Sequence, residues 1–105
     1  MANTPLTRNE AIERLRTVEG AIRQLGVRRL ALFGSVARNE ARPGSDVDLL
    51  VEFVPGLKSF DRFMALVELL EGVLGHQVEL LTTESLSPYI GPHILAEASD
   101  VLRAA

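Results

Sequence analysis

The stretch Gly34–Asp48, GSVARNEARPGSDVD, carries a Gly-Ser pair at its start and two alternating aspartates at its end. The residues before it, Leu30–Phe33, form a short apolar run that predicts a buried strand ending at Gly34. Ser35 then stands where a helix N-cap is expected, and the free N–H groups at the start of a helix favour an anion such as phosphate. Taken alone, the Gly-Ser pair is better explained by an ordinary strand-to-helix turn.

The two aspartates add a second chemical feature to this stretch. Side chains alternate along the predicted strand Asp46–Phe53, so Asp46 and Asp48 share one face while apolar residues share the other. Neighbouring carboxylates repel each other unless a cation offsets the repulsion, and Mg²⁺ binds carboxylates together with substrate phosphates. A solvated edge strand whose aspartates cap the turn after Pro43-Gly44 is the other interpretation. The apolar run that follows favours a central strand.

A third carboxylate comes from the next predicted strand, Gln77–Leu81. Val78 and Leu80 share one face of this strand, so Glu79 points to the opposite face, where it could join the two aspartates. A surface glutamate on an edge strand explains the same pattern equally well.

Together these residues resemble a known signature. Gly34-Ser35, ten intervening residues and Asp46-x-Asp48 look like the motif of the nucleotidyltransferase superfamily that includes DNA polymerase beta and the kanamycin nucleotidyltransferases. The short chain is similar to the minimal nucleotidyltransferases (MNT) of prokaryotes, which act as antitoxins paired with HEPN-domain toxins. The resemblance covers nearly the whole chain and implies a nucleotidyltransferase-like fold. At the position of Glu79 this family more often has Asp.

The resemblance also implies roles for individual residues. Asp46, Asp48 and Glu79 would be the catalytic residues and would hold two Mg²⁺ ions, with ATP as the donor of AMP to a hydroxyl group. Glu79 could also accept the proton of that hydroxyl. The candidates for nucleotide binding are Gly34, Ser35, Arg38, Arg42 and Ser45.

Three functions remain open from the sequence. The first is an active enzyme that transfers AMP to a partner protein, a HEPN toxin, and so acts as its antitoxin. The second is an antitoxin without turnover that neutralises its partner by contact, which a misplaced Glu79 would favour. The third is a small-molecule nucleotidyltransferase of the aminoglycoside-modifying type, but such enzymes usually carry a second domain for which 105 residues leave no room.

Length and composition predict a single domain over residues 1–105, with 47% hydrophobic and 24% charged residues. The net charge of −3 argues against direct binding of nucleic acid, and Lys58, the only lysine, lies in no P-loop motif. No apolar run is long enough for a membrane span and no signal peptide pattern is present. We therefore expect no membrane association and a cytoplasmic location, which the absence of cysteine fits. Whether the chain forms a homo-oligomer stays open.

The remaining pattern predicts an α/β or α+β domain, a small mixed β-sheet with helices packed on one face and the carboxylates on the other. A capping box at Thr7 and Glu10 predicts a first helix that runs to Gly26, and an apolar stripe predicts another helix over residues 60–74. Ser87-Pro88 predicts the start of a last helix, which Gly91-Pro92 should kink or restart, and Val101-Leu102 predicts a short edge strand.

Overall fold

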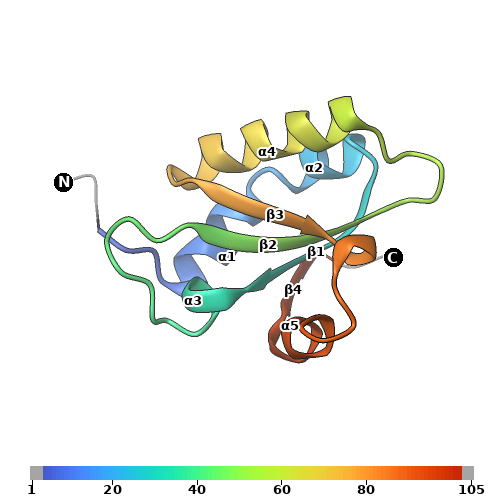
Figure 1. Ribbon diagram of the computed structural model, residues 1–105. Helices are drawn as coiled ribbons and strands as arrows, with labels where there is room; N and C mark the ends of the chain where they lie inside the picture. Colours follow the sequence, from blue (N-terminus) through green and yellow to red (C-terminus); the bar gives the residue numbers. More distant parts are fainter. Residues whose placement is uncertain (1–3, 103–105) are drawn as a thin grey trace.

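The computed structural model describes residues 4–102, and its centre is a mixed sheet with the strand order β3-β2-β1-β4 (Figure 1). The strands are β1 (Val27–Phe33), β2 (Val47–Phe53), β3 (Val78–Thr82) and β4 (Ser99–Leu102). β1 pairs antiparallel with both β2 and β4, whereas β2 and β3 pair in parallel. The central position predicted for the second strand and the edge position predicted for Val101-Leu102 are both confirmed.

The helices connect these strands. They are α1 (Arg8–Arg16), α2 (Glu19–Gln24), α3 (Gly34–Ala37), α4 (Phe60–Leu74), the 3-10 turn η1 (Thr83–Ser85) and α5 (Gly91–Glu97). α4 forms the crossover that two parallel strands require, and Ser59 caps its start by accepting a hydrogen bond from the Arg62 N–H with its side chain. Among residues 4–102, no helix has the length and apolar character that crossing a bilayer would need.

The main core lies between one face of the sheet and helices α1, α2 and α4. Alternate strand residues meet apolar side chains from all three helices there, and the fully buried members include Leu15, Ile22, Leu30, Leu32, Leu49, Val51, Leu66 and Leu70. Burying one such side chain stabilises the fold by about 1.5–3 kcal/mol. The packing on this face therefore supports the sheet whose opposite face carries the candidate site residues.

Helix α5 packs against the opposite face of the sheet. Its residue Ile94 contacts a second apolar cluster that contains Ala31, Phe33 and Leu50. The prediction of a small mixed sheet is confirmed, and helices α1, α2 and α4 share one face as expected, but α5 does not. The difference arises because β1 and β2 are apolar on both faces near these residues, so the second face also needs a cover.

Two predicted helix boundaries were wrong. The first helix has its predicted capping box at Thr7 and Glu10, but it stops at Thr17, whose hydroxyl donates to the Arg14 carbonyl, and α2 follows as a separate helix. Ser87 forms a turn in which its side chain accepts from the Ile90 N–H. The last helix begins instead at Gly91, with a proline in its first turn, where the Gly91-Pro92 pattern predicted a restart.

Candidate active site

Asp48 and Glu79 lie side by side on the two parallel strands. They are register partners in the β2–β3 pairing, and because partners point to the same side of a sheet, both carboxylates project from the face that α5 partly covers. Neighbouring strands are about 4.8 Å apart. Asp48 is half-buried and Glu79 is exposed. The predicted meeting of these two strands is therefore present in the structure.

The electrostatics of Asp48 reflect this crowding. Its pKa is raised from 3.8 to about 6, first by burial, then by the charge of Glu79 and a hydrogen bond with it, and then by the charge of Asp46. The positive charge of Arg38 opposes the rise without cancelling it. A partly buried carboxylate among like charges is stabilised by a cation. The site thus carries negative charge that its own residues do not balance.

Asp46 lies just before the strand that was predicted to contain it. β2 begins at Val47, and Asp46 is exposed in the preceding connection. It still lies close enough to Asp48 for its charge to raise the pKa of that residue. Asp46 therefore belongs to one acidic site with Asp48 and Glu79. Because it precedes β2, the register of the sheet does not fix where its side chain points.

Gly34 allows Asp48 to take its position. The backbone of Gly34 has φ +76°, a left-handed conformation that residues with a Cβ rarely adopt, and a Cβ placed there would overlap the Asp48 Oδ2 atom. This conformation also corrects one prediction. α3 begins at Gly34 with Phe33 at the N-cap, so Ser35 lies in the first turn of the helix and is not its cap.

The turn that leads to the aspartates is held by Arg42 and Ser45. The Ser45 Oγ atom accepts a hydrogen bond of 2.9 Å from the Arg42 N–H, and the Ser45 N–H donates to the Arg42 carbonyl, also at 2.9 Å. Gly44 within this turn has φ +86°, as the Pro43-Gly44 pattern predicts. These bonds order the segment that presents Asp46. Contact of Arg42 or Ser45 with a nucleotide stays a prediction.

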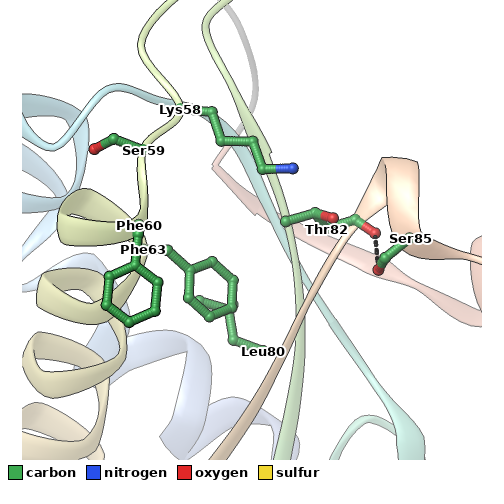
Figure 2. A pocket seen from close by; sticks show the side chains of 7 residues that line it. All are labelled: Lys58, Ser59, Phe60, Phe63, Leu80, Thr82 and Ser85. Carbon is green, nitrogen blue, oxygen red and sulfur yellow. Dashed lines mark hydrogen bonds between the residues drawn. The ribbon is translucent and has the colours of Figure 1, made fainter.

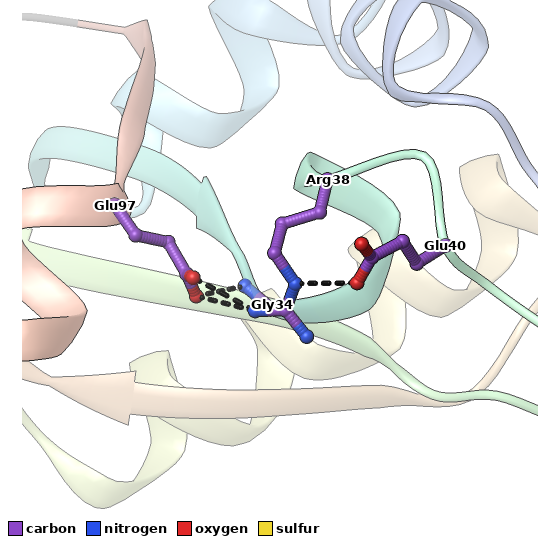
Figure 3. Close-up of polar contacts among 4 residues, drawn as sticks. All are labelled: Gly34, Arg38, Glu40 and Glu97. Carbon is purple, nitrogen blue, oxygen red and sulfur yellow. Dashed lines mark hydrogen bonds and ion pairs between the residues drawn. The ribbon is translucent and has the colours of Figure 1, made fainter.

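Arg38 extends from the end of α3 toward the acidic face, where two carboxylates bind it (Figure 3). Its Nε atom donates to Glu40 at 2.9 Å, and its Nη1 atom donates to Glu97 Oε2 at 2.7 Å and to Oε1 at 3.0 Å. These contacts raise the pKa of Arg38, so its charge is permanent. Its positive charge also acts to lower the pKa of Asp48, and contact of Arg38 with a nucleotide stays a prediction.

Glu97 is a site residue that the sequence did not reveal. Its Oε1 atom accepts a hydrogen bond of 2.9 Å from the Gly34 N–H, and the same carboxylate binds Arg38. These contacts lower the pKa of Glu97, with the Gly34 N–H as the largest cause. Positions 34 and 97 are far apart along the chain, and an acidic residue at the end of a short helix forms no local pattern that would have identified it.

The donor atoms of the site suit Mg²⁺. They are carboxylate oxygens, and Mg²⁺ commonly binds one or two carboxylates while waters and substrate phosphates complete its coordination. Within residues 4–102, no group of three or more His, Cys, Asp or Glu side chains is arranged to hold a metal ion by itself. Asp48 and Glu79, with Asp46 beside them, therefore fit a cation that is bound jointly with a substrate.

A separate cavity of about 490 Å³ lies at the other end of β3, and it contains none of the residues predicted for the site. Figure 2 shows Phe60 and Phe63 on its α4 side and Leu80 on β3. Leu80 belongs to the main core, on the face opposite to Glu79. The cavity is thus separated from the carboxylates by the sheet.

Comparison with known families agrees with this geometry. The model of the nucleotidyltransferase domain matches residues 15–101, a span that includes Gly34, Asp48, Glu79 and Glu97. The chain belongs to the nucleotidyltransferase domain family. It is therefore a nucleotidyltransferase, as the resemblance implied.

Several members of the nucleotidyltransferase family are similar over most of the chain. A protein of Methanocaldococcus jannaschii, provisionally named a protein adenylyltransferase, is 49% identical over 77 residues, which is 73% of this chain and 82% of the relative. The protein adenylyltransferase MntA of Thermococcus cleftensis is 42% identical over 74 residues, 70% of this chain and 74% of the relative.

Solved structures confirm the fold. A structure described provisionally as a minimal nucleotidyltransferase matches with a TM-score of 0.78 and 35% identity, over 90% of this chain and 95% of the other. A complex of a tri-AMPylated HEPN toxin of Shewanella oneidensis with its MNT antitoxin matches with a TM-score of 0.64 and 15% identity, over 93% of this chain and 74% of the other. The second likeness concerns the fold alone.

Proposed function

We propose that this nucleotidyltransferase transfers AMP from ATP to a hydroxyl group on a partner protein in a Mg²⁺-dependent reaction, and that it acts as the antitoxin of a HEPN toxin. The observation that carries the proposal is the register pairing of Asp48 with Glu79 beside Gly34, where the missing side chain leaves room for the Asp48 carboxylate. The arrangement offers a cation site and a phosphate-binding loop at one place.

In the proposed reaction, the oxygen of the acceptor hydroxyl attacks the α-phosphorus of ATP, the bond from that phosphorus to the bridging oxygen breaks, and pyrophosphate leaves. Bound Mg²⁺ would neutralise the charge that develops on the phosphate oxygens. Asp46, Asp48 and Glu79 would hold it, and the exposed carboxylate of Glu79 would take the proton of the hydroxyl. Arg38 would bind phosphate oxygens at the rim of the site.

The relatives support the choice of acceptor. The two archaeal relatives are named as protein adenylyltransferases, one of them provisionally, and this name specifies a protein as the acceptor. The Shewanella complex contains an AMPylated HEPN toxin bound to an MNT antitoxin, which supports a partner of the same kind for this chain. A small-molecule acceptor has no comparable support.

An antitoxin that acts by contact alone is the second candidate. It is favoured by the finding that residues 4–102 contain no ready-made group of three metal-binding side chains. In that case the acidic face would bind the partner without turnover.

The test is to incubate the protein with Mg²⁺, the protein encoded by its neighbouring gene, and ATP labelled on the α-phosphate. We expect label on the partner, none from ATP labelled on the γ-phosphate, and loss of labelling when Asp46 and Asp48 are both replaced by Asn. Labelling that survives the double replacement would show that the cation site is misassigned. Neutralisation of the partner without any labelling would establish the contact antitoxin.

A further inference from the structure

The groups proposed to bind the phosphates of ATP are already occupied by a side chain of the same protein. Glu97 accepts hydrogen bonds from the Gly34 N–H at 2.9 Å and from Arg38 at 2.7 Å (Figure 3). A backbone N–H together with a guanidinium is also a donor pair that phosphate oxygens can use. The carboxylate of Glu97 thus stands where an oxygen of the triphosphate would be held.

The position of Glu97 follows from the fold. It is the last residue of α5, which Ile94 anchors to the second apolar cluster, and β4 begins two residues later. Its backbone is therefore fixed at both ends, whereas 31% of its side chain is exposed. The carboxylate can leave the donors by rotation of its own side chain, without movement of the helix.

We propose that Glu97 is an internal substitute for phosphate that has to be displaced before the triphosphate binds, and that it thereby sets the affinity of the enzyme for nucleotide. The inference rests on the proposed phosphate-binding role of Gly34 and Arg38. The single N–H of Gly34 is shared poorly between two acceptors, and a carboxylate beside a triphosphate repels it. Nucleotide binding therefore competes directly with the Glu97 contact.

A structural role for Glu97 predicts the opposite outcome. If Glu97 served only to orient Arg38 toward the phosphates, then its removal would release the guanidinium and weaken nucleotide binding. Glu40 offers a matched control, because it binds Arg38 through Nε at 2.9 Å, whereas the Gly34 N–H donates to Glu97. Comparing variants of the two glutamates therefore distinguishes the effect of occupying the Gly34 N–H from the effect of pairing with Arg38.

The experiment measures dissociation constants by calorimetry for ATP, inorganic tripolyphosphate and adenosine, each in the presence of Mg²⁺. For Glu97→Gln we expect binding of ATP and of tripolyphosphate to become about 5–10-fold tighter, since one competing negative charge is removed. Adenosine has no phosphate, so its affinity should not change. For Glu40→Gln we expect a change of less than about twofold.

The outcomes separate this inference from the proposed function. Unchanged or weaker binding of ATP by Glu97→Gln, with clear binding by the wild type, would overturn the role of Glu97 and leave the proposed function standing. No binding of ATP by either protein would overturn the proposed function together with the inference. Glu97→Ala repeats the test without an amide group, and thermal unfolding of both variants confirms that they are folded.

Discussion

Asp48 and Leu49 are neighbours in β2, yet their side chains lie on opposite faces of the sheet in very different surroundings. Leu49 is fully buried among apolar side chains of the main core. Asp48 is half-buried beside two other carboxylates, with a pKa raised to about 6. One face of the strand therefore stabilises the protein, and the other keeps an unfavourable arrangement of charges to which we assign the proposed chemistry. Substitutions on the two faces should separate stability from activity.

The largest effect is expected for activity after Asp48→Asn. The variant keeps the size of the side chain but loses the negative charge proposed to hold Mg²⁺, so nucleotidyl transfer should fall by about a thousandfold, corresponding to roughly 4 kcal/mol in the barrier. Initial rates of labelling measure the effect. The variant should retain the circular dichroism of the wild type, and activity within tenfold of the wild type would contradict the role of Asp48.

On the opposite face, Leu49→Ala should act on stability. Truncation of this fully buried side chain leaves a cavity in the main core, and the free energy of unfolding should fall by about 2–5 kcal/mol. Urea denaturation provides the measurement. Leu49→Met, which nearly conserves volume, serves as the control and should lose less than about 1.5 kcal/mol. If the two variants were equally stable, the core would not be packed as described.

Gly34→Ala should lower both the stability and the activity of the protein. The added Cβ overlaps the Asp48 carboxylate, and the left-handed backbone at position 34 disfavours any residue but glycine. We expect a loss of about 1–3 kcal/mol in stability together with loss of activity. Gly72→Ala is the control, because a Cβ there meets no atom within 4 Å and Gly72 lies inside α4. That variant should be at least as stable as the wild type.

The smallest expected effect is a change with pH in the free energy of unfolding, measured in the absence of metal. The pKa of Asp48 is about 6 in the folded protein and about 3.8 when unfolded, so the folded state binds more protons between these values and loses stability as pH rises through them. At pH 7.5, Asp48→Asn should therefore be more stable than the wild type by about 1 kcal/mol, since water screens a half-buried group. The gain should vanish below pH 4. Thermal melts in EDTA at both pH values test this, and a less stable variant at pH 7.5 would contradict the pKa.

Local patterns were sufficient to predict most of the fold. The capping box at Thr7, the apolar run of β1 and the alternation of apolar residues in β2 and β3 act over a few residues, and the structure contains each of them. The shared face of Asp48 and Glu79 was also predictable, because side-chain alternation in two strands fixes it once the strands are neighbours.

What could not be predicted depends on contacts between distant segments. The packing of α5 on the second face requires Ile94 to meet residues of β1 and β2, and no local periodicity encodes that contact. The hydrogen bond from Gly34 to Glu97 is of the same kind. Ser35 was wrongly predicted as a cap because local sequence fixes a helix boundary only to within a residue or two, and α3 already begins at Gly34.

The parallel pairing of β2 and β3 has a consequence for how the protein is made. The two strands are joined through the whole of α4, so a nascent chain exposes its aspartates well before Glu79 leaves the ribosome. Until α4 has docked and β3 has paired with β2, Glu79 does not lie beside Asp48, and the acidic site is incomplete. If Glu79 is required as proposed, a chain that ends within α4 is inactive because it lacks β3, and activity then reports that the whole sheet has formed.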